Sequence, residues 1–123
     1  MPFTKTDFPG LLIFEPVVFA DSRGHFFESY NQRMFRGAGI INRFVQDNQS
    51  SSSYGVIRGL HYQLPPYDQA KLVRVLSGKI YDVVVDIRVG SPAYGQVFGI
   101  ELSDANKKQL FIPAGFAHGF SVL

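Results

Sequence analysis

The feature that most constrains this fold is a series of short apolar segments separated by turns that contain glycine or proline. Expected strands cover residues 11–19, 26–30, 44–48, 56–63, 70–76, 79–88, 96–102, 109–112 and 117–123. Gly78 is expected to form a tight hairpin, and Ser91-Pro92 marks another turn. Regular short strands joined by such turns predict an all-β sandwich or barrel.

Helix is expected in only two short places. Asn31 can cap a helix that runs to about Arg36 and ends at Gly37. Residues 103–106 have short helical character. The 123 residues show no internal repeat or linker and are long enough for a modest core, so we expect one domain over residues 1–123.

Composition excludes several classes of function. The formal charge of +2 is small and the basic residues form no run, so no nucleic-acid partner is expected, whereas an anionic small ligand is compatible with it. The chain has no cysteine, which excludes disulfides and thiolate chemistry. It also lacks a signal-peptide core or an apolar run of membrane-spanning length. We expect a soluble, cytoplasmic protein without a membrane partner.

Two segments place an imidazole inside an apolar, strand-like run. They are Arg58-Gly59-Leu60-His61-Tyr62-Gln63 and Pro113-Ala114-Gly115-Phe116-Ala117-His118-Gly119-Phe120. A histidine in a strand interior is costly unless its ring nitrogens find partners. Two such residues far apart in sequence suggest one pocket built from two strands of a closed sheet.

The alternation of side chains along a strand predicts which residues share a face. In residues 79–88, Asp82, Asp86 and Arg88 share a face with aliphatic residues, and we expect Asp82 to be interior and the other two to lie at the rim. Arg58 and His61 can line the same pocket only if the strand is irregular between them, and Gly59 is a natural bulge position.

Each candidate also has an ordinary structural interpretation. A hydrogen-bonded structural histidine is the default for His61 and for His118. By strand position alone, Lys71 is best read as a strand-end lysine whose ammonium reaches water. Ordinary surface charges or turn residues would account for the remaining candidates, which are Arg23, Glu28 and Gln46-Asp47-Asn48.

Other mechanisms have little support in the residues. No phosphate-binding glycine motif and no G-x-S-x-G motif occurs. A metal site is the serious rival, but the neighbour of His61 on its own face is Gln63, and glutamine is a poor ligand for zinc or iron. A metal is therefore disfavoured.

Six segments resemble one known family. The pattern Pro113-x-Gly115-x-x-His118 resembles the second motif of the cupin superfamily, and residues 58–63 lie where the first would be. More closely, the chain resembles the dTDP-4-dehydrorhamnose 3,5-epimerases of nucleotide-sugar biosynthesis. The matching segments are residues 21–28, 44–48, 58–63, 71–75, 82–88 and 112–120.

The resemblance implies a fold, a substrate and an assembly. The fold would be a cupin jelly-roll barrel with one or two short helices. The substrate would be a dTDP-linked 4-keto-6-deoxy sugar, epimerised at C3 and C5 through an enolate in dTDP-L-rhamnose biosynthesis. No metal or other cofactor would be needed. The protein would form a homodimer that exchanges N-terminal strands.

The resemblance also assigns roles by position. His61 would be the general base, and Lys71 would contact the substrate and stabilise the enolate. Arg58 and His118 would bind the substrate. A carboxylate that orients His61 would raise its basicity, and Asp82 is a candidate for that part. Residues that would hold the nucleotide and its phosphates are Arg23, Glu28, Gln46, Asp47 and Asn48.

Members of the family continue past the point that corresponds to Leu123. The tyrosine that acts as opposite-face acid in the family, and the aspartate paired with its catalytic histidine, belong to that later part. We therefore expect a domain without the family's C-terminal segment, with reduced or absent epimerase activity and partly retained nucleotide binding. The alternatives are a sugar-nucleotide 3,4-ketoisomerase, a non-catalytic nucleotide-sugar-binding cupin and a metal-dependent cupin.

Overall fold

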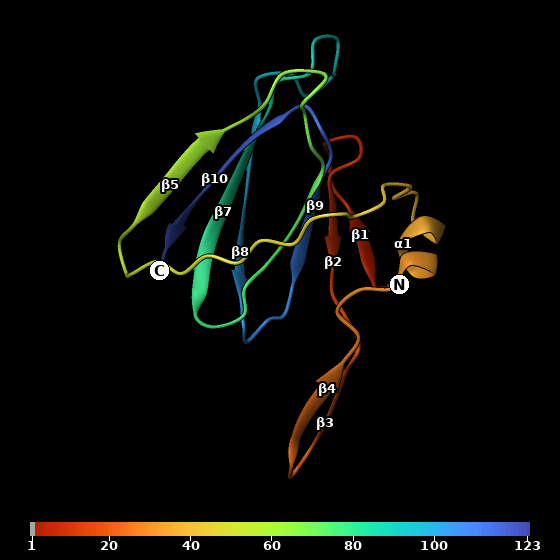
Figure 1. The fold of residues 1–123 in the computed structure, drawn as a ribbon, viewed down its shortest axis with the longest axis vertical. Helices are drawn as coiled ribbons and strands as arrows, with labels where there is room; N and C mark the ends of the chain where they lie inside the picture. The colour runs from red at the N-terminus through yellow and green to blue at the C-terminus, as the bar shows by residue number, and fades with distance from the viewer. Residues whose placement is uncertain (1) are drawn as a thin grey trace.

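Two antiparallel four-stranded sheets form the body of the protein, which a computed structural model describes over residues 2–123 (Figure 1). The first, here called the β9 sheet, has the order β1 (Phe3–Lys5), β2 (Leu12–Phe14), β9 (Gln109–Ile112) and β6 (Lys71–Arg74). The second, the β10 sheet, has the order β5 (Ile57–His61), β10 (Phe116–Val122), β7 (Lys79–Asp86) and β8 (Val97–Ser103).

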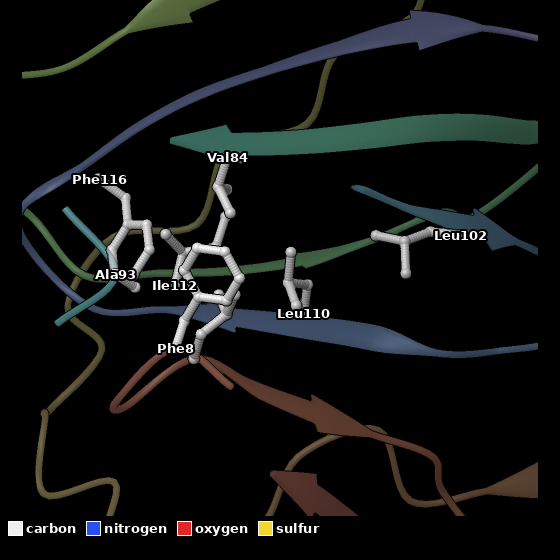
Figure 2. Packing of buried hydrophobic residues seen from close by; sticks show 8 residues of the cluster. Phe8, Val84, Ala93, Leu102, Leu110, Ile112 and Phe116 are labelled. Carbon is white, nitrogen blue, oxygen red and sulfur yellow. The ribbon is translucent and has the colours of Figure 1, made fainter. Parts of the chain in front are cut away.

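The main core lies between the two sheets. Val84 of β7 and Phe116 of β10 meet Leu110 and Ile112 of β9, as Figure 2 shows. All four side chains are at most 5% exposed. Burying an aliphatic or aromatic side chain of this size contributes about 1.5–3 kcal/mol, so these contacts hold the sheets face to face.

A second apolar cluster covers the outer side of the β9 sheet. Helix α1 (Gln32–Gly37) places Phe35 against Phe14 and Phe111, with the Phe14 and Phe35 rings 4.8 Å apart. The helix begins where predicted, because the Asn31 side chain accepts a hydrogen bond of 3.0 Å from the amide of Met34. Helix α1 is the only helix in the part of the chain that the structure describes.

Strands β3 (Val18–Asp21) and β4 (Gly24–Phe27) form a hairpin, called the arm below, that projects away from both sheets (Figure 1). The arm carries apolar side chains in water: Phe19 is 66% exposed and Phe26 is 71% exposed. At its base, the buried Gln109 donates a hydrogen bond of 2.9 Å from Nε2 to the carbonyl oxygen of Ser29. The arm therefore leaves the body from a fixed point.

The predicted all-β fold is confirmed, with differences in detail. The strand expected at 44–48 is wrong, because that segment pairs with no strand: Phe44 packs against the second apolar cluster and residues 45–48 are exposed. Strand β1 was not expected. The hairpin expected at Gly78 is wrong, because β6 and β7 belong to different sheets and the chain passes from one sheet to the other there. Residues 103–106 form a turn in which the Asn106 amide bonds the Ser103 hydroxyl. Across residues 2–123, no helix has the length and hydropathy that a membrane span requires.

Asp86 does not lie at the rim as expected, because it is completely buried at the end of β7. Arg88 donates to both of its carboxylate oxygens, at 3.1 and 2.9 Å, and the Ser91 hydroxyl donates at 2.6 Å. Burial alone would raise the pKa of Asp86, but the hydrogen bonds from Arg88 and Ser91 more than offset it and lower the pKa to about 2. This cluster closes one end of the β10 sheet.

The lowered pKa of Asp86 predicts a defined loss of stability in acid. Because the folded pKa of about 2 lies below the ordinary value of 3.8, the stabilisation is complete above about pH 4 and is lost as the pH falls from about 4 to 2. We expect Asp86→Asn to lower the free energy of unfolding at pH 7 by about 2 kcal/mol and to flatten its pH dependence in this window.

Urea unfolding followed at several pH values measures both effects of Asp86→Asn. Asp104→Asn, an exposed carboxylate in the turn after β8, is the control. An unchanged slope between pH 4 and 2 in Asp86→Asn would show that the acid sensitivity arises elsewhere.

Candidate active site

The inner face of the β10 sheet gathers Arg58, His61, His118 and Asp82. On β10, His118 is paired with His61 of β5 on one side and with Val84 of β7 on the other. Directly paired residues of antiparallel strands point to the same face. Since Val84 belongs to the core between the sheets, both histidines face that interior.

Arg58 reaches the same face through an irregularity in β5. Its partner on β10 is Phe120, which is also paired with Asp82 of β7. The register shifts between these pairs, so that Gly59 and Leu60 together oppose Gly119. The prediction that a bulge at Gly59 lets Arg58 and His61 share a face is confirmed.

His118 and Asp82 form a buried pair. Nε2 of His118 and Oδ1 of Asp82 share a hydrogen bond of 2.6 Å, and Asp82 is 0% exposed. The second oxygen of Asp82, Oδ2, has no hydrogen-bond partner among residues 2–123. The hypothesis that Asp82 orients His61 is therefore wrong in this structure: the strand register gives the carboxylate to the other imidazole.

Lys71 belongs to the opposite wall. It begins β6 and is paired with Ile112 of β9, whose side chain is part of the core between the sheets. Lys71 is half-buried, whereas His61 is exposed because β5 is an edge strand. The register thus directs the ammonium and the imidazole toward the same interior from two different sheets.

Two of the predicted nucleotide-binding residues lie on or beside the arm. At its tip Arg23 donates to Asp21 over 2.7 Å, and these hydrogen bonds hold the pKa of Asp21 below its usual value. Glu28 is exposed just after β4. Within one chain the arm points away from the sheets (Figure 1), so the structure does not bring these residues together with His61.

The remaining predicted residues, Gln46, Asp47 and Asn48, lie in the exposed segment between α1 and β5. Further along it, the hydroxyl of Ser52 accepts a hydrogen bond of 2.8 Å from Nε of Arg58. Sequence reasoning assigned no role to Ser52, and the sequence gives no signal for this contact. The bond ties the segment to the inner-face residues.

The chemical content of this interior is a pair of imidazoles, a carboxylate and two cations. An imidazole can take up a proton near neutral pH, and a cation can stabilise an oxyanion that develops beside it. Within residues 2–123 no group of three or more histidine, aspartate or glutamate side chains is placed to hold a metal ion. The arrangement is suited to proton transfer at a carbon next to a carbonyl group.

Comparison with known proteins agrees with this arrangement. The profile of the family described as dTDP-4-dehydrorhamnose 3,5-epimerase matches residues 5–123. The chain belongs to that family. The predicted family, its isomerase class and its epimerase function are thereby confirmed, and the alternative activities are not favoured.

Individual relatives show how far the similarity extends. The dTDP-4-dehydrorhamnose 3,5-epimerase of Shigella flexneri is 58% identical over 124 residues, which cover 100% of this chain and 68% of the relative. A Bacillus anthracis epimerase structure, solved with TDP and PPi bound, superposes with a TM-score of 0.95 at 48% identity and covers 98% of this chain and 70% of its own. The chain spans about two thirds of the length of these relatives.

The buried pair predicts a non-additive effect on stability. His118→Leu leaves the Asp82 carboxyl group buried without its partner, and we expect it to lower the free energy of unfolding by about 3 kcal/mol. The double variant Asp82→Leu/His118→Leu removes both polar groups and should recover most of that loss. Urea unfolding of the four proteins of this cycle measures the coupling, and additive losses would contradict the pairing.

Proposed function

We propose that His61 and Lys71 carry the epimerisation of a dTDP-linked 4-keto-6-deoxy sugar at C3 and C5, His61 as the base and Lys71 as the enolate-stabilising cation. The observation that carries this proposal is their placement on facing walls of one interior, by registers that are independent of each other. A Legionella pneumophila epimerase solved in complex with dTDP-4-keto-L-rhamnose supports the substrate class. It is 52% identical, with a TM-score of 0.93, and covers 98% of this chain and 64% of its own.

The reaction explains why these two residue types are needed. The imidazole of His61 removes the proton from a carbon next to the C4 ketone, and the electron pair moves onto the ketone oxygen. The Lys71 ammonium stabilises that oxyanion. Return of a proton to the opposite face of the carbon inverts the centre, and repetition at the second carbon completes the epimerisation. No redox change occurs, so the reaction needs no redox cofactor, and the Lys71 ammonium is proposed to supply the positive charge that the enolate requires.

Arg58 and His118 are proposed to bind the sugar nucleotide beside the base. Both face the same interior as His61. The contact with buried Asp82 fixes the His118 ring, and the Ser52 hydroxyl fixes the Arg58 guanidinium. Each therefore presents a polar group whose orientation is set before substrate arrives, which lowers the entropic cost of binding.

We further propose that two copies of the chain exchange arms. The arm exposes Phe19 and Phe26 and makes its only strand pairing within itself, among the residues that the structure describes. Covering these side chains with the partner subunit would remove apolar surface from water. It would also deliver Arg23 and Glu28 to the partner's interior, where the phosphates of dTDP need a cation. Gln46, Asp47 and Asn48 would contact the nucleotide from the segment before β5.

The extent of the domain stays a prediction. The chain is proposed to form a single cupin-like unit over residues 1–123. The acid that returns the proton from the opposite face is assigned by the family resemblance to a part of the relatives beyond the matched region. We propose that nucleotide binding depends on the arm and the segment before β5, and that full turnover needs that acid.

Removing the base or the cation should abolish proton abstraction. We expect His61→Ala to reduce the exchange of the C3 hydrogen with solvent deuterium at least about 100-fold, and Lys71→Met to reduce it by a similar factor. NMR of a dTDP-4-keto-6-deoxy sugar in D₂O measures this. Lys79→Met, which removes an exposed lysine at the start of β7, is the matched control. Exchange at the normal rate in His61→Ala would remove it from the role of base.

Arm exchange predicts complementation between two inactive variants. Arg23→Glu damages the arm, and His61→Ala damages the interior. In an equal mixture of the two, half of the dimers would be mixed, and each mixed dimer would hold one intact site, so the exchange rate should recover to about one quarter of the unsubstituted value. Exchange no greater than the sum of the two separate variants would place both residues in one chain's site.

A further inference from the structure

We infer that Gly119 and Gly59 are positioning residues that place His61 in the interior by allowing two strands to approach unusually closely. The inference rests on the proposed role of His61 as base. Gly119 does not face the interior, since it is paired with Val83 on the outer face of the β10 sheet, and Gly59 lies against it on β5. The two glycines act through the backbone geometry of β5 and β10 and make no proposed contact with the substrate.

Alternation along a strand creates the problem that these glycines solve. Arg58 and His61 are three residues apart, so a regular strand would direct them to opposite faces. The structure inserts one extra residue in β5, so that Gly59 and Leu60 oppose the single residue Gly119. Both functional side chains then face the interior.

The extra residue leaves no room for a side chain on the facing strand. A Cβ atom at position 119 would lie 2.7 Å from the carbonyl oxygen of Arg58 and 3.2 Å from the Cα of Gly59. A Cβ at position 59 would lie 2.6 Å from the Cα of Gly119. These neighbours are backbone atoms, which cannot rotate away. A side chain at either position would therefore force the two strands apart.

The two glycines differ in a way that makes one of them the better probe. Gly59 has a φ of +116°, a conformation that strains any other residue whatever the space. Gly119 has no positive φ, so alanine there is strained only through its contact with β5. Gly119→Ala therefore tests the close approach of the strands and nothing else in the backbone.

We expect Gly119→Ala to push the bulge away from β10 and to turn His61 out of the interior. A displacement of about 1 Å can cost about 100-fold in rate, so deuterium exchange should fall at least that far. Affinity for dTDP, measured by calorimetry, should stay within about twofold. The residues proposed to hold the nucleotide and its phosphates lie on the arm and in the segment before β5, and dTDP lacks the sugar that Arg58 and His118 would contact beside the base. A loss of dTDP affinity in parallel with the loss of exchange would indicate general damage and overturn the inference.

A structural measurement makes the test independent of activity. The protein has three histidines, and ring protons of directly paired residues on one face lie close enough for a nuclear Overhauser effect. The effect between His61 and His118 should be present in the unsubstituted protein and lost in Gly119→Ala. Its retention would overturn the inference, whereas normal exchange in His61→Ala would overturn only the proposed function.

Gly99→Ala is the matched control. Gly99 also lies in a strand of the β10 sheet and is paired with Val83, but a Cβ there would run into the Tyr81 ring on the outer face. The Tyr81 side chain is exposed and can rotate away, so Gly99→Ala should disturb neither the His61–His118 effect nor the exchange rate. Equal loss of both signals in Gly99→Ala and Gly119→Ala would point to destabilisation of the sheet as the common cause and contradict the inference.

If Gly119→Ala does not fold, the same substitution can be tested in a protein that lacks Gly59. Deleting Gly59 removes the extra residue, and Arg58 and His61 then have the even spacing of a regular strand. Alanine at 119 should be tolerated in this background, with a folded protein and a restored His61–His118 effect. Failure of Gly119→Ala to fold in both backgrounds would mean that the glycine serves another contact, and the inference would fall.

Discussion

Contact between the inner faces of the two sheets holds every other feature in place. Sheets that pack face to face lie about 10 Å apart, a distance set here by Leu110 and Ile112 on one side and Val84 and Phe116 on the other. A long lysine side chain from one wall and an imidazole from the other can then approach the same small molecule. The apolar core thus also sets the distance between the two walls of the proposed active site.

The two buried carboxylates of β7 are treated differently by the fold. Asp86 receives three side-chain hydrogen bonds from Arg88 and Ser91 and behaves as a structural anchor. Asp82 lies on the same face of β7, four residues before Asp86. It has one hydrogen-bond partner, His118, and its Oδ2 has none. The fully hydrogen-bonded carboxylate of Asp86 stabilises the end of the sheet, whereas Asp82 keeps one buried oxygen without a protein partner, next to the imidazole of His118.

The sequence predicts most of the architecture, because alternation and turn residues are local signals. It predicts the cap at Asn31 and the irregularity at Gly59, each of which depends on a few neighbouring residues. It wrongly predicts a hairpin at Gly78, because a turn residue does not reveal that the chain passes there from one sheet to the other. It misses the partner of Asp82, because a register between β7 and β10 decides which imidazole the carboxylate meets. It also places Asp86 at the rim, because a strand pattern does not reveal that the following turn folds back over the strand end. The function came from six matching segments, which hold more information than any single motif.

The hydrogen bond that holds the base of the arm has a consequence for the chain during its synthesis and folding. Gln109, which holds Ser29, is supplied by β9, a late strand in the sequence, so the arm is synthesised long before its anchor exists. During that interval the apolar side chains of Phe19 and Phe26 have no covering surface, and exposed apolar side chains on an unpaired edge favour aggregation. Anything that delays the folding of β9 should therefore lengthen the exposure of these two phenylalanines and raise aggregation.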